Sequence, residues 1–116
     1  MVGKKFDKMK VRWDCVPFDV LEGLADVMGY GAKKYNENPK EPNWKKVEDG
    51  YNRYFAALMR HLVADRKGEY LDKESGLPHM SHAMFNVVCL AHFAKENNKE
   101  IMTGCPDEME DVYDSK

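Results

Sequence analysis

Hydrophobic residues recur at intervals of three and four along residues 17–35, which is the spacing of one face of an α-helix. The residues that form this stripe are Phe18, Leu21, Leu24, Ala25 and Met28. Pro17 suits the first helical turn because that turn needs no backbone N–H donor, and the two lysines before Tyr35 suit the last turn. The pattern predicts a helix from Pro17 to about Tyr35 whose apolar stripe faces a core.

Two more helices are predicted later in the chain. Residues 50–67 carry a broad apolar face that includes Tyr54, Leu58 and Leu62, and Gly68 ends this segment. Residues 78–97 are apolar almost all round, which is typical of a helix in the middle of a bundle or at a contact between subunits. Residues 36–49 and 68–77 are rich in proline, glycine or polar residues and are predicted to be loops.

These elements fit one all-α domain. A chain of 116 residues can bury one core, so we expect a small bundle of about four helices over residues 12–102. A basic arm, residues 1–11, precedes it, and an acidic tail, residues 103–116, follows it. Because the apolar faces exceed what one small bundle can hide, we expect a homodimer or a homotetramer.

Charge and composition exclude several classes of partner. A net charge of −2 gives no general attraction to nucleic acid or to an anionic membrane. No apolar run approaches the roughly 18 residues that cross a bilayer, and the first ten residues lack the apolar centre of a secretory signal. Three widely spaced cysteines contain no CxxC pair. We therefore expect a cytoplasmic protein with no nucleic-acid or membrane partner.

Side chains that can bind metal or transfer protons are concentrated between Arg60 and Asn86. They are His61, Glu69, Asp72, Glu74, His79 and His82, with Asn86 on the same helix face as the last two. A single HxxH pair on a helix is often two hydrogen-bonded structural histidines. The concentration of acids and imidazoles favours instead a divalent cation site for a phosphate-bearing substrate.

Further acids and bases could complete such a site. Glu22 and Asp26 lie one turn apart on the predicted first helix, either as a solvated acidic face or as cation ligands. Carboxylate oxygens favour Mg²⁺, and imidazole is acceptable to Mn²⁺, so we expect Mg²⁺ with Mn²⁺ as a possible substitute. Arg53 and Arg60 belong to a basic stripe on the second helix, which is either solvated or a clamp for a polyphosphate, together with Lys34.

Trp44 stands in a polar loop, where a large aromatic residue needs an explanation. It either folds back to cap the core or offers a flat surface to a nucleobase, with Asn43 supplying hydrogen bonds to the edge of the base.

The sequence contains no HD dipeptide, no HExxH pattern, no Walker loop and no GxSxG elbow. Several common hydrolase classes are thereby excluded.

Residues 10 to about 93 resemble the phage dATP/dGTP diphosphohydrolase family, called MazZ in phages that use 2-aminoadenine. The resemblance rests on KVRWDCVPFDVLEGLADVMGYGAKKY, on the NW pair at 43–44, and on RYFAALMRHLVADRKGEYLDKESGLPHMSHAMFN. It implies a MazG-like all-α nucleotide pyrophosphohydrolase that cleaves purine deoxynucleoside triphosphates (dGTP and dATP) between the α and β phosphates. The products would be the monophosphate and pyrophosphate, and dGMP would feed 2-aminoadenine nucleotide synthesis.

The resemblance points to a set of site residues. It implies catalytic roles for His61, Glu69 and His79, and metal ligation by Glu22, Glu69, Asp72 and Glu74. We expect the substrate to be bound by Lys34, Asn43, Trp44, Arg53, Arg60, His82 and Asn86. The chain departs from the MazG signature, EExxE followed by ExxD, because His79 and His82 can be aligned where acids are expected.

Two other functions fit the same residues. The site could cleave a nucleotide at a different phosphate, or the helical domain could bind a nucleotide or a protein without catalysis. Product analysis tests the first alternative. The second predicts that nucleotide turnover is at background both in the wild-type protein and in a variant that lacks a carboxylate of the site.

Overall fold

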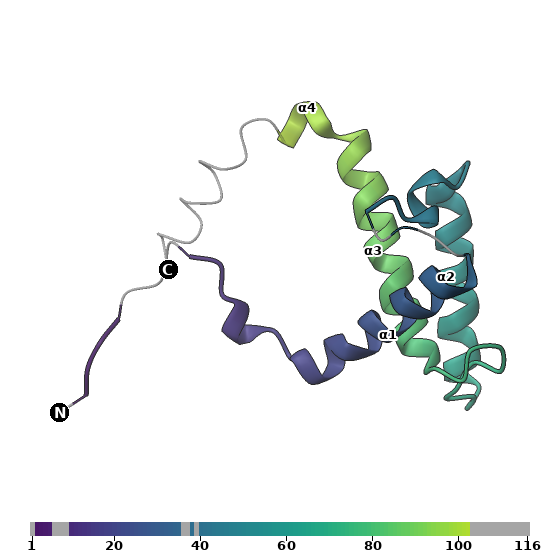
Figure 1. Ribbon diagram of the computed structural model, residues 1–116, viewed down its shortest axis with the longest axis horizontal. Coiled ribbons are helices and arrows are strands. Elements are labelled where there is room, and N and C mark those ends of the chain that lie inside the picture. The colour runs from purple at the N-terminus through teal and green to yellow at the C-terminus, as the bar shows by residue number, and fades with distance from the viewer. Residues whose placement is uncertain (1, 6–9, 36–37, 39, 103–116) are drawn as a thin grey trace.

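Helix-starting and helix-ending residues place three long helices close to where the sequence predicts them. The computed structural model describes residues 2–5, 10–35, 38 and 40–102. Helix α1 spans Phe18–Lys34, α2 spans Gly50–Arg66, α3 spans His79–Asn97, and a single turn, α4, spans Lys99–Met102 (Figure 1). Two short 3-10 helices, η1 (Trp13–Cys15) and η2 (Asn43–Lys46), precede α1 and α2, and the described residues contain no strand. The prediction of an all-α chain with about four helices is confirmed.

Helices α2 and α3 form an antiparallel hairpin, and α1 lies across it (Figure 1). Gly50 allows the close approach of the hairpin helices, because a Cβ atom at this position would lie 2.6 Å from the Phe93 ring. Gly23 does the same between α1 and α3, where a Cβ atom would collide with the side chain of Ser81. The helices therefore pack through small residues at two points.

The connection between α2 and α3 is itself a tight hairpin. Gly68 ends α2 with a φ of 100°, and Gly76 turns the loop with a φ of 73°, a region that disfavours side chains. The backbone N–H of Asp72 donates to the carbonyl of Leu77 at 2.8 Å, and the N–H of His79 donates to the carbonyl of Tyr70 at 2.9 Å. These bonds hold the loop against the start of α3.

The fully buried core is small. It contains the apolar residues Val27, Ala83 and Cys89. The prediction that the stripe from Phe18 to Met28 faces the core is wrong for Phe18 and Met28, which are 55% and 37% exposed, and for Ala25, which is exposed too. Phe18 is exposed because the chain before α1 and the first turns of α1 extend away from the hairpin (Figure 1). In the later turns Val27 is the buried residue, and the neighbouring Met28 lies on another side of the helix.

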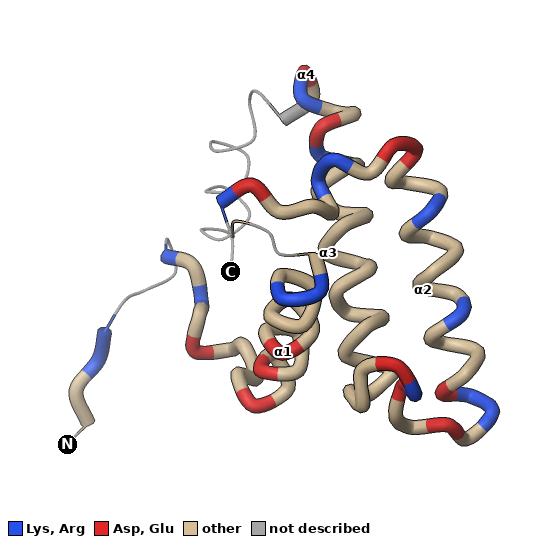
Figure 2. Tube along the Cα trace, turned by 45° about the vertical axis from the view of Figure 1, so that its right-hand side comes forward, with Lys and Arg blue, Asp and Glu red and all other residues tan. Residues whose placement is uncertain are grey.

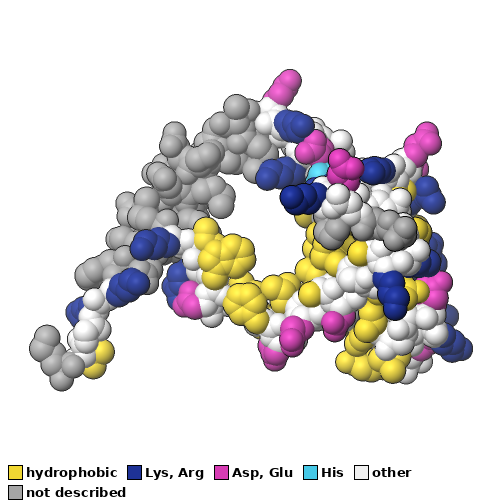
Figure 3. Space-filling model, viewed as in Figure 1, with side chains coloured by type: hydrophobic (Ala, Val, Ile, Leu, Met, Phe, Trp, Pro, Cys, Tyr) yellow, Lys and Arg dark blue, Asp and Glu magenta, His cyan; other side chains and the backbone are white. Residues whose placement is uncertain are grey.

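Large apolar side chains remain on the surface of the chain. Tyr51, Phe55, Met59 and Val63 follow one another at steps of four residues along α2 and are all exposed. Figure 3 shows further hydrophobic side chains exposed on the arm that precedes α1.

The acidic tail predicted for residues 103–116, and residues 1 and 6–9 of the basic arm, lie outside the described residues. None of the described helices is both long enough and apolar enough to cross a membrane.

Candidate functional site

A cavity of about 670 Å³ lies between the later turns of α1, η2, and the α2–α3 hairpin. One part of its lining is aromatic and comes from Trp44, Tyr54 and Phe85. Another part is ionisable and comes from His61, Asp72, His82, Lys34 and Glu74. The volume lies within the range of about 300–1,000 Å³ that is usual for small-ligand sites. A ligand in this cavity would meet aromatic surface and ionisable groups together.

His61, Asp72 and His79 form the group of side chains that we call the imidazole–carboxylate cluster. A potential ligand atom from each of the three lies within 4.8 Å of those of the other two. The Nδ1 atoms of His61 and His79 are 2.8 Å apart. Two imidazole nitrogens at that distance share one proton or, without it, direct two lone pairs at a cation. The cluster therefore has the donor chemistry of a cation site.

Ser75 connects Asp72 to a third histidine. Its hydroxyl lies 2.9 Å from Asp72 Oδ2 and 2.7 Å from His82 Nε2, and its backbone N–H donates to the same Asp72 oxygen at 2.9 Å. If the hydroxyl donates to the carboxylate, it accepts from His82 Nε2–H, which makes Nδ1 the lone-pair nitrogen of a neutral His82. Ser75 thereby orients two ionisable side chains of the cavity.

The outer nitrogen of His79 is buried. His79 is 5% exposed, and its Nε2 has no hydrogen-bond partner among the described residues. Glu69 Oε1 is 3.4 Å from this nitrogen, in poor alignment for a hydrogen bond. The Glu69 side chain is 40% exposed. Glu69 thus lies behind the cluster, next to His79.

Burial and neighbouring charge decide the protonation of the cluster. Burial, with the neighbouring His82 and His79, lowers the pKa of His61. Burial also lowers the pKa of His82, although Asp72 opposes this effect. Burial alone would raise the pKa of Asp72, but the two hydrogen bonds from Ser75 keep it below its ordinary value. His61 and His82 are therefore neutral, and Asp72 is charged, at neutral pH.

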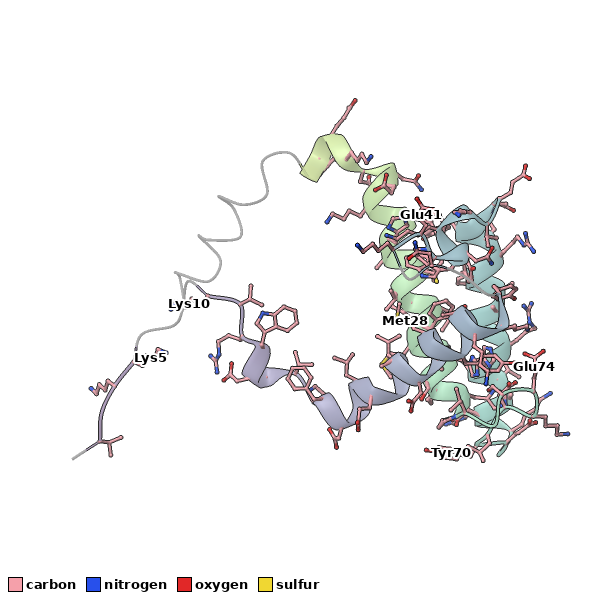
Figure 4. All side chains as sticks on the ribbon, in the orientation of Figure 1. Lys5, Lys10, Met28, Glu41, Tyr70 and Glu74 are labelled. Atoms are coloured by element: carbon pink, nitrogen blue, oxygen red, sulfur yellow. The ribbon has the colours of Figure 1, made fainter. Side chains whose placement is uncertain are left out.

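Lys34, Glu74 and Tyr30 form a bridge from α1 to the α2–α3 connection, where Figure 4 labels Glu74. The Lys34 ammonium lies 3.2 and 3.1 Å from the two Glu74 oxygens, and the Tyr30 hydroxyl donates to one of them at 3.0 Å. Lys34 lowers the pKa of Glu74, and Glu74 raises the pKa of Lys34. All three side chains line the cavity, so a cation and an anion already face each other at its edge.

Trp44 fulfils the first of the two roles that the sequence left open, the capping of the core, and its contact with a base stays a prediction. Its ring meets Phe85, His92 and Phe93 edge-on, with centroids 6.3, 5.1 and 6.4 Å away, so it caps the hairpin. It also lines the cavity, beside Asn43. Its indole Nε1 is buried without a hydrogen-bond partner among the described residues. A buried N–H donor of this kind is costly unless an acceptor reaches it.

Comparison with known proteins adds the family. Residues 2–103 match the family described as "dATP/dGTP diphosphohydrolase, N-terminal". The chain belongs to this family. A relative in Salmonella phage PMBT28, named dATP/dGTP diphosphohydrolase, is 31% identical over 83 residues, which cover 72% of this chain and 27% of the relative. The chain therefore spans about a quarter of that relative's length. No solved structure matches the chain.

Membership of the dATP/dGTP diphosphohydrolase family confirms the resemblance seen in the sequence, while the individual site residues stay predictions. The structure brings several of them together at the cavity. These are Lys34, Asn43, Trp44, His61, Asp72, Glu74 and His82, with His79 and Glu69 directly behind.

Other predicted residues lie elsewhere. Glu22 is exposed on α1, outside the cavity lining and outside the cluster. Arg53 is exposed on α2, where its guanidinium lies 3.5 Å from the Glu48 carbonyl. Arg60 lines a separate hollow of about 450 Å³, together with Lys67 and Glu69. Figure 2 shows the basic residues of α2 spaced along that helix. The structure thus gives Glu22, Arg53 and Arg60 no direct place in the cavity.

Asn86 is 3% exposed and donates its amide N–H to the carbonyl of His82 at 2.9 Å. This bond satisfies the side chain within α3, away from the cavity lining. Sequence reasoning also missed Ser75, Tyr30, Tyr54 and Phe85 as neighbours of the site. Ser75 follows Asp72 by three residues, the spacing of a side-chain-capped turn, and could have been found from that signal. The three aromatic residues carry no such signal.

Proposed function

We propose that this domain hydrolyses dATP and dGTP to the monophosphate and pyrophosphate in the 670 Å³ cavity. The observation that carries the proposal is the meeting, in one cavity, of an aromatic wall with His61 and Asp72 of the imidazole–carboxylate cluster. The printed name of the phage relative supports the same substrates. We further propose that the dGMP formed feeds 2-aminoadenine nucleotide synthesis, as expected from the resemblance to the phage dATP/dGTP diphosphohydrolase family.

The aromatic part of the cavity suits the purine. Trp44, Tyr54 and Phe85 give flat apolar surface for the base, and Tyr54 stacks in parallel on Phe93, which fixes its ring. Asn43, at the start of η2, places an amide beside the same wall. An amide donates and accepts hydrogen bonds, so it can meet the edge of a purine.

The ionisable part of the cavity suits the phosphates. Lys34 and Lys45 bring two positive charges to its lining. An entering polyphosphate would compete with Glu74 for Lys34, because both offer anionic oxygens to the same ammonium group. Asp72, kept charged by Ser75, requires a compensating cation before a polyanion approaches it.

The donor atoms of the cluster fit a divalent cation, as the closeness of the two Nδ1 atoms and of the Asp72 carboxylate indicates. His61 and Asp72, exposed to the cavity, would hold it with His79. A bound divalent cation neutralises phosphate charge and lowers the pKa of bound water. The sequence prediction was Mg²⁺ with Mn²⁺ as a substitute.

The direct test is product analysis. Purified protein is incubated with dGTP or dATP and with Mg²⁺ or Mn²⁺, and the products are separated by anion-exchange chromatography. Equal amounts of monophosphate and pyrophosphate are expected. Release of orthophosphate or tripolyphosphate would indicate a different cleavage position, and no product with any cation would contradict the enzymatic proposal.

A matched pair of variants tests the site. Asp72→Asn removes the charge that faces the cavity and is expected to lower kcat by at least about 100-fold, as for the loss of one essential electrostatic group. Asp26→Asn makes the same chemical change on the exposed face of α1 and is expected to retain wild-type kcat. Equal rates for both variants would place the chemistry elsewhere.

We also propose that the active form is a homodimer or homotetramer. The exposed stripe of Tyr51, Phe55, Met59 and Val63 on α2 supports self-association, because such a row of apolar side chains is typical of a subunit contact. Light scattering after size-exclusion chromatography measures the mass directly. Phe55→Glu is expected to yield a monomer, and a monomeric wild-type protein would contradict the proposal.

A further inference from the structure

The three donors of the imidazole–carboxylate cluster come from three parts of one hairpin. His61 lies on α2, His79 is the first residue of α3, and Asp72 lies in the connection between them. The loop that carries Asp72 is fixed at both ends by backbone hydrogen bonds between Asp72 and Leu77 and between Tyr70 and His79. The donors are therefore held in place before any ligand arrives, which favours binding.

The spacing of the two imidazoles is close to that of two ligands on one ion. Nitrogen ligands about 2.0–2.1 Å from a metal lie roughly 2.8–3.0 Å apart in octahedral coordination and roughly 3.3–3.4 Å apart in tetrahedral coordination. The observed Nδ1–Nδ1 distance is 2.8 Å. The two nitrogens therefore already have the spacing of neighbouring ligands on an octahedral ion, and a tetrahedral ion would need them to separate by about half an ångström.

Glu69 has the position of a partner that orients His79. A histidine that ligates metal through one nitrogen commonly donates its other N–H to a carboxylate. Nε2 of His79 is buried, and the nearest carboxylate oxygen, of Glu69, is 3.4 Å away. With the proton on Nε2, the lone pair of a neutral His79 lies on Nδ1, which faces His61.

Ser75 orients the carboxylate in a comparable way. Both hydrogen bonds from Ser75 end on Oδ2 of Asp72. Oδ2 is thereby occupied, which leaves Oδ1 as the oxygen with free lone pairs. The cluster then consists of two imidazole nitrogens and one carboxylate oxygen, and His79 and Asp72 each have a neighbour that can fix their orientation.

We propose that His61, Asp72 and His79 form a site that prefers a transition-metal dication, of the class of Mn²⁺, Co²⁺ or Zn²⁺, to Mg²⁺. Mg²⁺ favours coordination by oxygen alone, whereas imidazole ligands suit the later metals. The inference rests on the proposed function for the role of this cation, and it replaces the sequence prediction of Mg²⁺ by a different metal class. Glu69 and Ser75 act as positioning residues through His79 and Asp72.

Titration calorimetry of the metal-free protein, with no nucleotide present, tests the selectivity. Co²⁺ is expected to bind at least about 100-fold more tightly than Mg²⁺, as the donor set requires. His61→Asp exchanges one nitrogen donor for oxygen and is expected to reduce this ratio at least tenfold. His92→Gln removes an imidazole outside the cluster and is expected to keep the wild-type ratio. Equal affinity of the wild-type protein for Co²⁺ and Mg²⁺ would overturn the proposal.

A measurement on the unaltered protein covers the case in which the His61→Asp variant fails to fold. In histidine-selective NMR spectra, addition of Mn²⁺ is expected to broaden the ring signals of His61 and His79 well before those of His92. Equal broadening of all histidines would overturn the site. Neither experiment includes a nucleotide, so the two proposals can fail separately. Selective metal binding by a protein that does not hydrolyse dATP or dGTP would contradict the proposed function alone. Hydrolysis of these nucleotides by a protein that does not prefer Co²⁺ to Mg²⁺ would contradict this inference alone.

Discussion

Removal of the Ser75 hydroxyl tests the hydrogen-bond network that supports the cavity wall. In Ser75→Ala, Asp72 loses the bond of 2.9 Å from the hydroxyl, and His82 loses its partner at 2.7 Å. The backbone N–H of Leu77, which donates to the same hydroxyl at 3.2 Å, loses its acceptor. The bond from the backbone N–H of Ser75 to Asp72 remains. The change is otherwise small, because alanine lacks only the oxygen.

The expected loss of stability follows from the type and exposure of these bonds. A bond to a charged group contributes about 1.5–3 kcal/mol and a neutral bond about 1 kcal/mol. The side chains of Asp72 and His82 are 20% and 12% exposed, so water can replace part of what is lost. We therefore expect the free energy of unfolding to fall by about 2–3 kcal/mol, as for other buried network deletions.

Urea denaturation, monitored by circular dichroism in EDTA, measures this difference. If the midpoint urea concentration falls while the free energy of unfolding keeps the same dependence on urea, the native state, and not the denatured ensemble, has changed. Ser75→Thr keeps the hydroxyl and should recover most of the stability. Asn52→Ala, which deletes an exposed hydrogen bond to Asp49, should cost no more than about 0.5 kcal/mol. If Ser75→Ala costs as little as this control, the network does not stabilise the site.

Three further predictions follow from burial and packing. Folding lowers the pKa of both His61 and His82, so below the ordinary histidine pKa of 6.5 the unfolded chain binds more protons than the folded chain. The metal-free protein should therefore lose stability as the pH falls from about 7.5 to about 5.5, and a constant melting temperature over this range would contradict the prediction. Burial raises the pKa of the Cys89 thiol to about 12, so iodoacetamide at neutral pH should modify exposed Cys15 and leave Cys89 intact in the folded protein. Peptide mass spectrometry measures both reactions, and equal modification of the two cysteines would refute the prediction. Gly23→Ala should reduce the free energy of unfolding by about 1–3 kcal/mol, because its methyl group would overlap α3, whereas Gly29→Ala, at a position with open space, should not destabilise the chain.

The sequence predicted the helices well because their ends carry strong local signals. Pro17 precedes α1, Gly68 follows α2 and Pro78 precedes α3, and the predicted bounds agree with the observed ones to within a residue or two. Periodicity was less informative about burial. It identified residues that share a face of α1, but it could not identify which turns of α1 contact α3, so Val27 was missed and Phe18 was assigned to the core.

The prediction of the site was limited in the same way, because helical periodicity does not show how one helix contacts another. The segment from His61 to His82 could be singled out because its ionisable residues are close in sequence, and the hairpin brings His61, Asp72 and His79 together. Glu22 was added from another helix without knowledge of how that helix crosses the hairpin. The turn at Gly76, by contrast, places Ser75 between Asp72 and His82, and this arrangement depends on the backbone of the loop more than on any helical pattern.

The division of the site between the hairpin and α1 has a consequence for the two proposals. All three donors of the imidazole–carboxylate cluster lie on the α2–α3 hairpin, whereas α1 supplies Lys34 and Tyr30 at the edge of the cavity. A change that displaces α1 should therefore weaken nucleotide binding and leave the cation affinity of the hairpin intact. Gly23→Ala is such a change, because its added methyl group acts at the α1–α3 contact. Parallel loss of both affinities in this variant would mean that α1 also determines the geometry of the cluster.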